Sequence, residues 1–447
     1  KIAEKYYNEA YEIRSRLSEA DPEKYEHELA KTINNLANLY KRQNNIDRAR
    51  ELYEESLRLR EQCTERNPQL YEFDKASSLY NIGSLYMKLD RYDEAITYVQ
   101  KALEIEERLV ERSPEVYEYL HSYSNTLETL SHLYYIQDDY SKAEQLCQTA
   151  ISNIEGLVQK NQKGFEKSYA DILVHLSSVH QRLGEYDDAD DEIHRALDIF
   201  QKLAIKFVGK YEEDIVYALR VIADNYCQRA QYVAAEEPID KAMKISERLY
   251  SEDKSAYARL HAISLYQRAS IYTLLTEYDA AERLYIESLA IFEEMQNIAP
   301  EISKREQLIV KGYLADLYRY YKGEYENALP KYEELVEEYK ALIVTNNSIT
   351  LQLDCAHLLS RLADCYEGIG ERVMYKNALK DAIAFYNTIQ DETIATKTRI
   401  ATLHLSLALA YSVDEEYEES FGYYQKAVDL YSYIYQSNPV SVTVYLG

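Results

Sequence analysis

The chain has 447 residues, with 51 Lys+Arg against 77 Asp+Glu, so its formal net charge at pH 7 is −26. This acidity disfavours nucleic acid as a ligand, because phosphate-binding surfaces need clustered Lys and Arg. There are only 11 Gly and 7 Pro, whereas roughly 30 and 20 would be expected at average usage. Residues that end helices and build β-turns are therefore scarce, and we predict an almost entirely helical protein.

The cysteines and the apolar segments indicate where such a chain works. The five cysteines are odd in number, widely separated and without a C-x-x-C pair, which argues against a disulfide framework or a zinc site and favours a reducing compartment. The most apolar stretch, 403–410, is far shorter than the ~20 residues of a membrane span. No signal peptide is visible. The sequence predicts a cytoplasmic protein that does not enter a membrane.

An internal repeat is the strongest signal in the sequence. A small residue followed three positions later by a tyrosine, once by a histidine, recurs nine times at spacings of 45–48 residues. These markers are Tyr40, Tyr86, Tyr134, His180, Tyr226, Tyr272, Tyr318, Tyr366 and Tyr411. About nine residues after each marker comes a second element of small, bulky and small residues, as in Ala49, Tyr53 and Ser56. Spacings of 3, 4 and 7 form one helical stripe, so each repeat is predicted to be a helix pair, A then B.

The small residues and tyrosines on these two helices closely resemble the tetratricopeptide repeat over essentially the whole chain. The usual unit has about 34 residues, and the longer period here adds about three helical turns, roughly 18 Å of helix. Long-period versions of this kind look like those of kinesin light chains and of bacterial sensor arrays attached to caspase-like peptidases and signalling ATPases. The resemblance implies an all-α, right-handed α-solenoid (superhelix) of tandem antiparallel helix pairs.

We expect a single solenoid over 1–447, with a lone helix B at 1–20 and a terminal segment at 438–447. The nine helix pairs are expected at 29–74, 75–120, 121–168, 169–214, 215–259, 260–306, 307–352, 353–399 and 400–437. The eighth pair departs from the pattern, because Gly368–Gly370 displaces its small-residue stripe. Solenoids need polar caps at both termini, and neither is evident. We therefore expect the chain to be a fragment of a longer protein, with any catalytic domain outside it.

Support for catalysis is slight. The sequence has no phosphate loop, nucleophile elbow or zinc-protease motif. His180 occupies a core tyrosine slot and is interpreted as an interior histidine. Asp187, Asp190, Asp191 and His194 share a helical neighbourhood that could hold a divalent cation, but acidic residues in the first turns of a helix more commonly complement its dipole. The prediction is a non-catalytic protein without metal or cofactor.

The family resemblance implies that helix A lines the concave face of each repeat. Its exposed positions would then fall at −9, −6, −5, −2, +1 and +2 from the marker. In the first two repeats these positions are rich in amides and positive charge: Lys31, Asn34, Asn35, Asn38, Lys41, Arg42, Asn81 and Lys88. Asparagine can pair with the backbone of an extended peptide, and Lys or Arg with carboxylates. The alternative is that each of these residues is simply solvated.

Later repeats place a more varied set on the same positions. These candidates are His132, Tyr135, His175, Arg182, Arg220, Asp224, Gln267, Tyr313, Arg319 and Tyr320. An asparagine ladder at −5 is supplied only by Asn35 and Asn81, so a composite surface is expected instead of a uniform groove that reads a peptide backbone. Exposed tyrosines suit this role, since they bury a large area and keep a polar group.

The predicted function is a protein-interaction scaffold or sensor array that captures a peptide or a partner's surface in its concave groove. The outer faces, given the net charge, would favour basic partners. Two alternatives stay open. The chain could be the regulatory arm of a larger peptidase or signalling NTPase, or a rod that self-associates through its uncapped ends.

Overall fold

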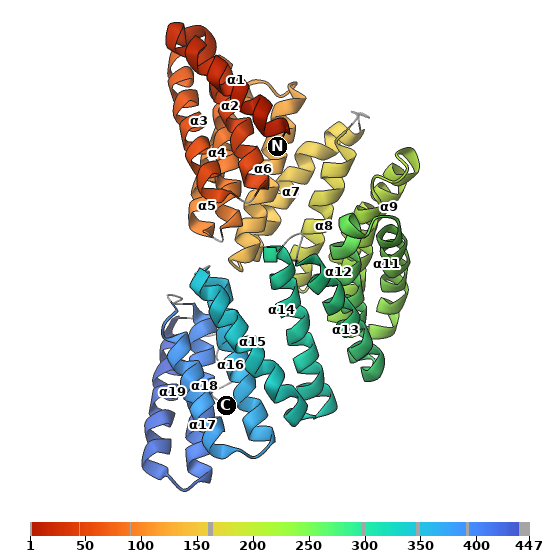
Figure 1. Ribbon diagram of the computed structural model, residues 1–447, viewed down its shortest axis with the longest axis vertical. Helices are drawn as coiled ribbons and strands as arrows, with labels where there is room; N and C mark the ends of the chain where they lie inside the picture. Colours follow the sequence, from red (N-terminus) through yellow and green to blue (C-terminus); the bar gives the residue numbers. More distant parts are fainter. Residues whose placement is uncertain are drawn as a thin grey trace. The chain divides into compact units, whose positions relative to one another are not determined.

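The computed structural model describes residues 2–43, 45–89, 91–159, 164–296, 300–345, 349–389 and 393–437. All regular secondary structure in these ranges is helical (Figure 1). The helices are α1 (Ile2–Ala20), α2 (Pro22–Arg42), α3 (Ile46–Arg66), α4 (Pro68–Lys88), α5 (Tyr92–Arg112), α6 (Tyr117–Ile136), α7 (Tyr140–Gln159), α8 (Glu166–Leu183), α9 (Tyr186–Lys206), α10 (Glu212–Gln228), α11 (Tyr232–Glu252), α12 (Lys254–Leu274), α13 (Tyr278–Met295), α14 (Pro300–Asp316), the π-helix η1 (Leu317–Lys322), α15 (Tyr325–Thr345), α16 (Ile349–Gly368), α17 (Arg372–Tyr386), α18 (Ile394–Val413) and α19 (Tyr417–Ser437). The terminal segment predicted at 438–447 lies outside the described residues.

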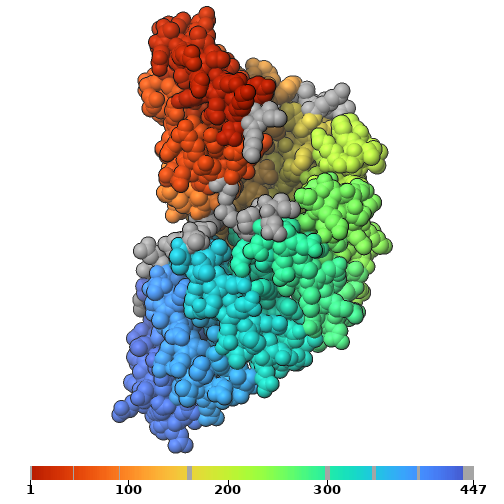
Figure 2. All heavy atoms as spheres, viewed as in Figure 1, coloured from red at the N-terminus to blue at the C-terminus, as the bar shows by residue number. Residues whose placement is uncertain are grey.

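Two compact units divide the chain, Lys1–Gln231 (unit 1) and Tyr232–Gly447 (unit 2). In each unit, helices that follow one another along the chain pack against one another. The sequence colours therefore change gradually along each unit (Figure 2). The predicted all-α solenoid of tandem helix pairs is confirmed as the fold class. The prediction that one continuous array spans residues 1–447 stays a prediction.

Local sequence sets where the helices begin. Asp21 precedes α2, and its carboxylate accepts a hydrogen bond from the Lys24 backbone N–H at 3.3 Å. Pro22 and Pro68 are the first residues of α2 and α4. Proline is suited to this position, because its fixed φ matches the helix and its missing N–H would be unpaired there in any case. Among the described helices, none is both long and apolar enough to span a membrane.

The small residues predicted at the helix crossings are buried. Seven alanines nine or ten positions after the markers have no exposed surface: Ala49, Ala95, Ala143, Ala189, Ala235, Ala281 and Ala328. Serine hydroxyl groups bridge two of these crossings. Ser131 Oγ donates to the carbonyl of Ala143 at 2.7 Å, and Ser177 Oγ donates to that of Ala189 at 2.8 Å. The side chain of one helix thus reaches the backbone of its partner, as the small-residue pattern predicts.

Two repeats absorb extra residues. In the seventh repeat, Ala328 follows its marker Tyr318 by ten positions instead of nine, and the chain there forms η1, since a π-helical turn accommodates one additional residue. In the eighth repeat, α16 ends at Gly368 against the ring of Tyr325. A Cβ atom on Gly368 would clash with that ring, so no other residue fits without displacing it.

A substitution at Gly83 on α4 would test whether the backbones of paired helices lie as close together as the structure shows. A Cβ atom there would lie 2.6 Å from Val99 Cγ2 and 3.1 Å from the carbonyl oxygen of Ala95 on α5. We expect Gly83→Ala to lower the free energy of unfolding by about 1–3 kcal/mol through overpacking. The matched control is Gly156→Ala on α7, where a Cβ would meet nothing within 4 Å. Alanine should stabilise that helix by roughly 0.5–1 kcal/mol.

The measurement is thermal unfolding followed by far-ultraviolet circular dichroism. The two variants should shift the midpoint in opposite directions. A Gly83→Ala midpoint at or above that of the unchanged chain would contradict the proposed backbone contact between α4 and α5.

Candidate functional site

Helices A of successive repeats lie side by side in unit 1. Helix α4 contacts α6, α6 contacts α8, and α8 contacts α10. Hydrogen bonds between side chains join α2 to α4. We call the surface carried by α2, α4, α6, α8 and α10 the inner face of unit 1. Most of the sequence-predicted binding residues fall on it.

At the α2–α4 end, part of the predicted polar cluster is used to join the helices. Asn81 Nδ2 donates to Asn34 Oδ1 at 3.1 Å, and Lys41 Nζ donates to Ser84 Oγ at 2.6 Å. Lys88 is exposed, and its Nζ donates a hydrogen bond to the Lys41 carbonyl at 3.4 Å. Burial and the charge of Lys88 lower the pKa of Lys41 to about 8. Asn34 is only 7% exposed, so its predicted exposure was wrong, because α4 covers it.

The remaining residues of this cluster are more open. Lys31 and Arg42 are exposed. Asn35 lines a recess of about 270 Å³ against α1. Asn38 is half-buried, and its Oδ1 accepts from the Tyr53 hydroxyl at 2.6 Å. Two cations and one amide therefore stay available to a ligand at this end.

A pocket of about 340 Å³ opens on the inner face between α6, α8 and α10. We call it the α6–α8–α10 pocket. Its lining residues are Glu128, His132, Tyr135, Asp171, Val174, His175, Ser178, Phe200, Asp214 and Tyr217. Three of them, His132, Tyr135 and His175, were predicted from the sequence.

Two histidines of adjacent repeats form one wall of the pocket. The rings of His132 and His175 stack with their centroids 3.4 Å apart, and His175 Nε2 lies 2.9 Å from Ser131 Oγ. His175 is only 5% exposed, so its predicted exposure was wrong, because the −5 position of one repeat meets the −2 position of the repeat before it. Burial and the neighbouring His132 lower the pKa of His175 to about 2. Neutral His175 therefore contributes an aromatic surface. The Tyr135 ring meets it edge-on at 5.8 Å.

Three carboxyl groups, Glu128, Asp171 and Asp214, also line the pocket. Lys167 Nζ lies 2.9 Å from Asp171 Oδ1 and 3.1 Å from Asp214 Oδ1. Burial, together with the charge of Asp171, raises the pKa of Glu128 to about 7. Burial also raises the pKa of Asp171. Three carboxyl groups thus share one ammonium group, and the pocket favours a further positive charge.

Other predicted residues of unit 1 border this surface. Arg182 donates two hydrogen bonds, of 3.0 and 2.7 Å, to the Tyr140 hydroxyl. The Arg220 guanidinium lies 5.9 Å from the centroid of the Tyr217 ring. Asp224 is exposed. Arg182 is thus held at the turn between helices, while Arg220 and Asp224 extend the surface beyond the pocket.

In unit 2 the predicted residues form an aromatic group. Tyr313 is 42% exposed, and its ring stacks on those of Tyr266 and Tyr285 at centroid distances of 5.9 and 6.0 Å. Gln267, next to Tyr266, is half-buried. The structure brings these residues together, but in a different unit from the α6–α8–α10 pocket.

Arg319 was predicted to be exposed and is only 3% exposed. Its guanidinium forms ion pairs with Asp364 and, at 3.9 Å, with Asp316. The exposed Tyr320 ring lies against it at 3.4 Å. The prediction was wrong because the π-turn that begins at Leu317 changes the angular position of the residues after it. Arg319 is therefore part of the core, and only Tyr320 of this pair is open to a ligand.

The acidic run at the start of α9 is paired internally. Arg229 lies 2.9 Å from Asp190 Oδ2 and 3.1 Å from Asp187 Oδ1. His194 Nδ1 lies 2.8 Å from the Asp190 carbonyl. Since one guanidinium balances two of these carboxylates, the structure gives this run a packing role.

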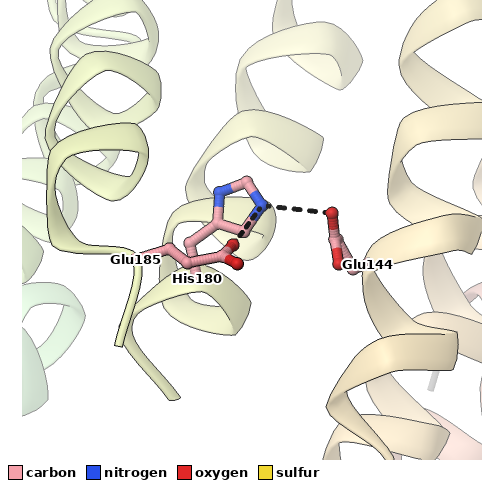
Figure 3. Close-up of side chains that lie close together, drawn as sticks. All are labelled: Glu144, His180 and Glu185. Atoms are coloured by element: carbon pink, nitrogen blue, oxygen red, sulfur yellow. Dashed lines mark ion pairs between the residues drawn. The ribbon is translucent and has the colours of Figure 1, made fainter. Parts of the chain in front are cut away.

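The position of His180 in the core was predicted from the sequence, but the carboxylates around it were not. His180 is buried at the end of α8, and its Nδ1 lies 2.9 Å from Glu192 Oε2. Its Nε2 lies 3.7 Å from Glu144 Oε1 and 3.6 Å from Glu185 Oε2 (Figure 3). Burial alone would lower the pKa of His180, but the hydrogen bond to Glu192 and the nearby carboxylates raise it. The repeat spacing could have indicated Glu144, because it precedes the marker His180 by 36 positions, just as Glu4 precedes the marker Tyr40.

Comparisons with known proteins agree with the geometry. Residues 29–62 and 74–156 match models of the tetratricopeptide repeat. No curated protein matches the chain. Among solved structures, the apo form of RapI is similar with a TM-score of 0.50 at 14% identity, over 91% of this chain and 99% of that one. Residues 29–62 and 74–156 therefore contain tetratricopeptide repeats, and the likeness to RapI extends the fold over most of the chain.

Two further solved structures are similar at lower scores. A Rap protein complexed with competence and sporulation factor gives a TM-score of 0.45 at 17% identity, over 92% of this chain and 99% of that one. BtubC from P. vanneervenii gives 0.45 at 20% identity, over 55% of this chain and 90% of that one. At such identities a likeness concerns the fold alone.

The raised pKa of Glu128 predicts a pH-dependent stability. The folded chain favours the protonated carboxyl group of Glu128. This group's contribution to the free energy of unfolding is therefore fully present below pH about 4.5 and is lost as the pH rises through about 7. Glu128→Gln removes the ionisation and should therefore stabilise the chain more at pH 8 than at pH 5.5. We expect a difference of about 1–2 kcal/mol, since one pKa unit corresponds to about 1.4 kcal/mol before allowance for partial exposure.

The check is the midpoint of urea unfolding at both pH values. Glu104→Gln, at an exposed position of α5, is the matched control for loss of one charge. An effect of Glu128→Gln equal to that of the control at both pH values would count against the prediction.

Proposed function

We propose that this chain is a protein-interaction scaffold whose inner face in unit 1 binds an extended segment of a partner protein. The observation that carries the proposal is the α6–α8–α10 pocket, in which aromatic rings and carboxyl groups converge from three successive repeats. Its walls belong to helices packed by the repeat scaffold. A ligand would therefore find these groups already in place, at little ordering cost on the receptor side.

The pocket is suited to a lysine or arginine side chain. Glu128, Asp171 and Asp214 supply negative charge in excess of the single ammonium of Lys167. Tyr217, which is 50% exposed, offers a ring face to the aliphatic stem or the cation of such a side chain. A cation near Glu128 would also stabilise its ionised form.

The α2–α4 end favours the opposite charge. Lys31 and Arg42 are exposed there, and Lys or Arg can pair with the carboxylates of a ligand. Asn35 adds a donor and an acceptor for a peptide backbone. A segment with acidic residues toward α2 and α4 and a basic residue in the α6–α8–α10 pocket would match both ends.

Selection of random peptides displayed on phage against the chain tests this proposal. We expect enrichment of peptides with a lysine or arginine, and loss of at least 10-fold in affinity for a selected peptide in the double variant Glu128→Gln, Asp171→Asn. Loss of a buried charge partner typically costs about 2–5 kcal/mol of binding free energy. Glu104→Gln serves again as the control and should bind as the unchanged chain does.

Two outcomes would contradict the proposal. One is that selection enriches no peptide. The other is that enriched peptides bind the double variant as tightly as they bind the unchanged chain, with circular dichroism showing that the variant is folded.

A further inference from the structure

The fourth repeat departs from the others at its marker, which is His180 instead of tyrosine. In the seventh repeat, the Tyr318 hydroxyl donates to Glu282, and Lys322 Nζ lies 2.6 Å from the same carboxylate. The glutamate therefore has a neutral donor and a compensating cation. Lys322 stands four positions after its marker.

The fourth repeat, like every repeat except the seventh, has no cation at this position. Gly184 stands four positions after His180. Glu144, Glu185 and Glu192 all face the imidazole, and among the described residues their ion pairs are with His180 alone. Three carboxylates thus surround one group that carries at most a single positive charge. Glu192 is buried and Glu144 is partly buried, whereas Glu185 is half-exposed. Glu144 Oε1 also accepts a hydrogen bond from Gln148 Nε2 at 2.5 Å. The buried part of this charge favours a further cation, since buried charge is costly unless it is paired.

The orientation of His180 points to where that cation would lie. Its Nδ1–H is directed at Glu192 Oε2, 2.9 Å away, in the manner of a carboxylate that orients a metal-binding histidine. The Nε2 atom is then the free ligand position. It faces Glu144 from α7 and Glu185 from the turn that precedes α9 (Figure 3).

The distances are close to those of ligands that share an ion. The Nε2–oxygen separations of 3.7 and 3.6 Å exceed the roughly 2.7–3.2 Å of a hydrogen bond. Two ligand atoms at about 2.0–2.2 Å from one tetrahedral ion lie roughly 3.3–3.6 Å apart. The three ligand atoms all lie within 4.8 Å of one another. A small adjustment of the side chains would place them around one ion.

We propose that Glu144, His180 and Glu185 bind one divalent metal ion of the zinc type, with Glu192 as the residue that positions His180. An imidazole beside carboxylates suits zinc, whereas calcium and magnesium prefer oxygen ligands throughout. The ion would join helix B of the third repeat to helix A of the fourth and to the turn after it. This site is separate from the α6–α8–α10 pocket and departs from the sequence-based expectation of no metal.

The test titrates the metal-free chain with Zn²⁺ by calorimetry and with Co²⁺ by visible absorption. We expect one dominant site per chain. His180→Tyr, which restores the residue used at the other markers, should weaken zinc binding by about 100-fold or more. Glu192→Gln should weaken it by roughly 10-fold through loss of the positioning contact. His194→Ala, at an exposed position of α9, is the matched control and should leave this site unchanged.

A second measurement keeps the proposal falsifiable if a variant folds poorly. Zinc should raise the thermal unfolding midpoint of the unchanged chain and of His194→Ala, but not that of Glu185→Gln, whose substitution lies at a half-exposed side chain. Zinc binding that His180→Tyr leaves intact would overturn the proposal. So would the absence of a stoichiometric site in the unchanged chain, which would leave His180 as a protonated partner of the three carboxylates.

Discussion

The close approach of paired helix backbones is the constraint on which the structure depends. Ser131 and Ser177 reach carbonyl groups of the partner helix at 2.7 and 2.8 Å, and Gly83 has no room for a Cβ atom. This close approach restricts how the paired helices pack, so each of the remaining positions of the repeat faces a defined neighbour. Three markers, Tyr40, His180 and Tyr318, meet a glutamate of the preceding helix, and positions between the markers of unit 1 lie on its inner face. Binding chemistry can therefore vary along the array while the scaffold stays the same.

The helix pairs and their buried alanines could be predicted from the sequence, because both depend on local periodicity. Ala49 and Ala281 are buried for the same reason, the short distance to a neighbouring helix. Several tyrosines were likewise assigned to the architecture, and Tyr53 and Tyr332 are fully buried in the structure. The repeats also helped this prediction, because a position whose role is ambiguous in one repeat can be compared with the same position in the eight others.

The contacts between successive repeats could not be predicted in this way. Asn34 meets Asn81 across 47 positions, and His132 meets His175 across 43. A helical wheel treats these positions as open, because it contains no neighbouring helix. Arg319 adds a second cause, since a single inserted residue changed the helix type and turned the side chain inward. Exposure thus depends on the neighbouring helix as well as on position within the repeat.

A residue that departs from the repeat pattern can indicate chemistry that the repeated positions do not have. In the other eight repeats the marker is a tyrosine, whose hydroxyl is neutral at pH 7. A histidine at that position accepts or releases a proton, so its surroundings must balance a charge that the other repeats do not have. In the seventh repeat Lys322 balances Glu282, whereas in the fourth repeat Gly184 leaves His180 to balance three carboxylates. Either a proton or a metal ion supplies the positive charge there, and the Nε2–oxygen separations of 3.7 and 3.6 Å are compatible with the metal ion that we propose.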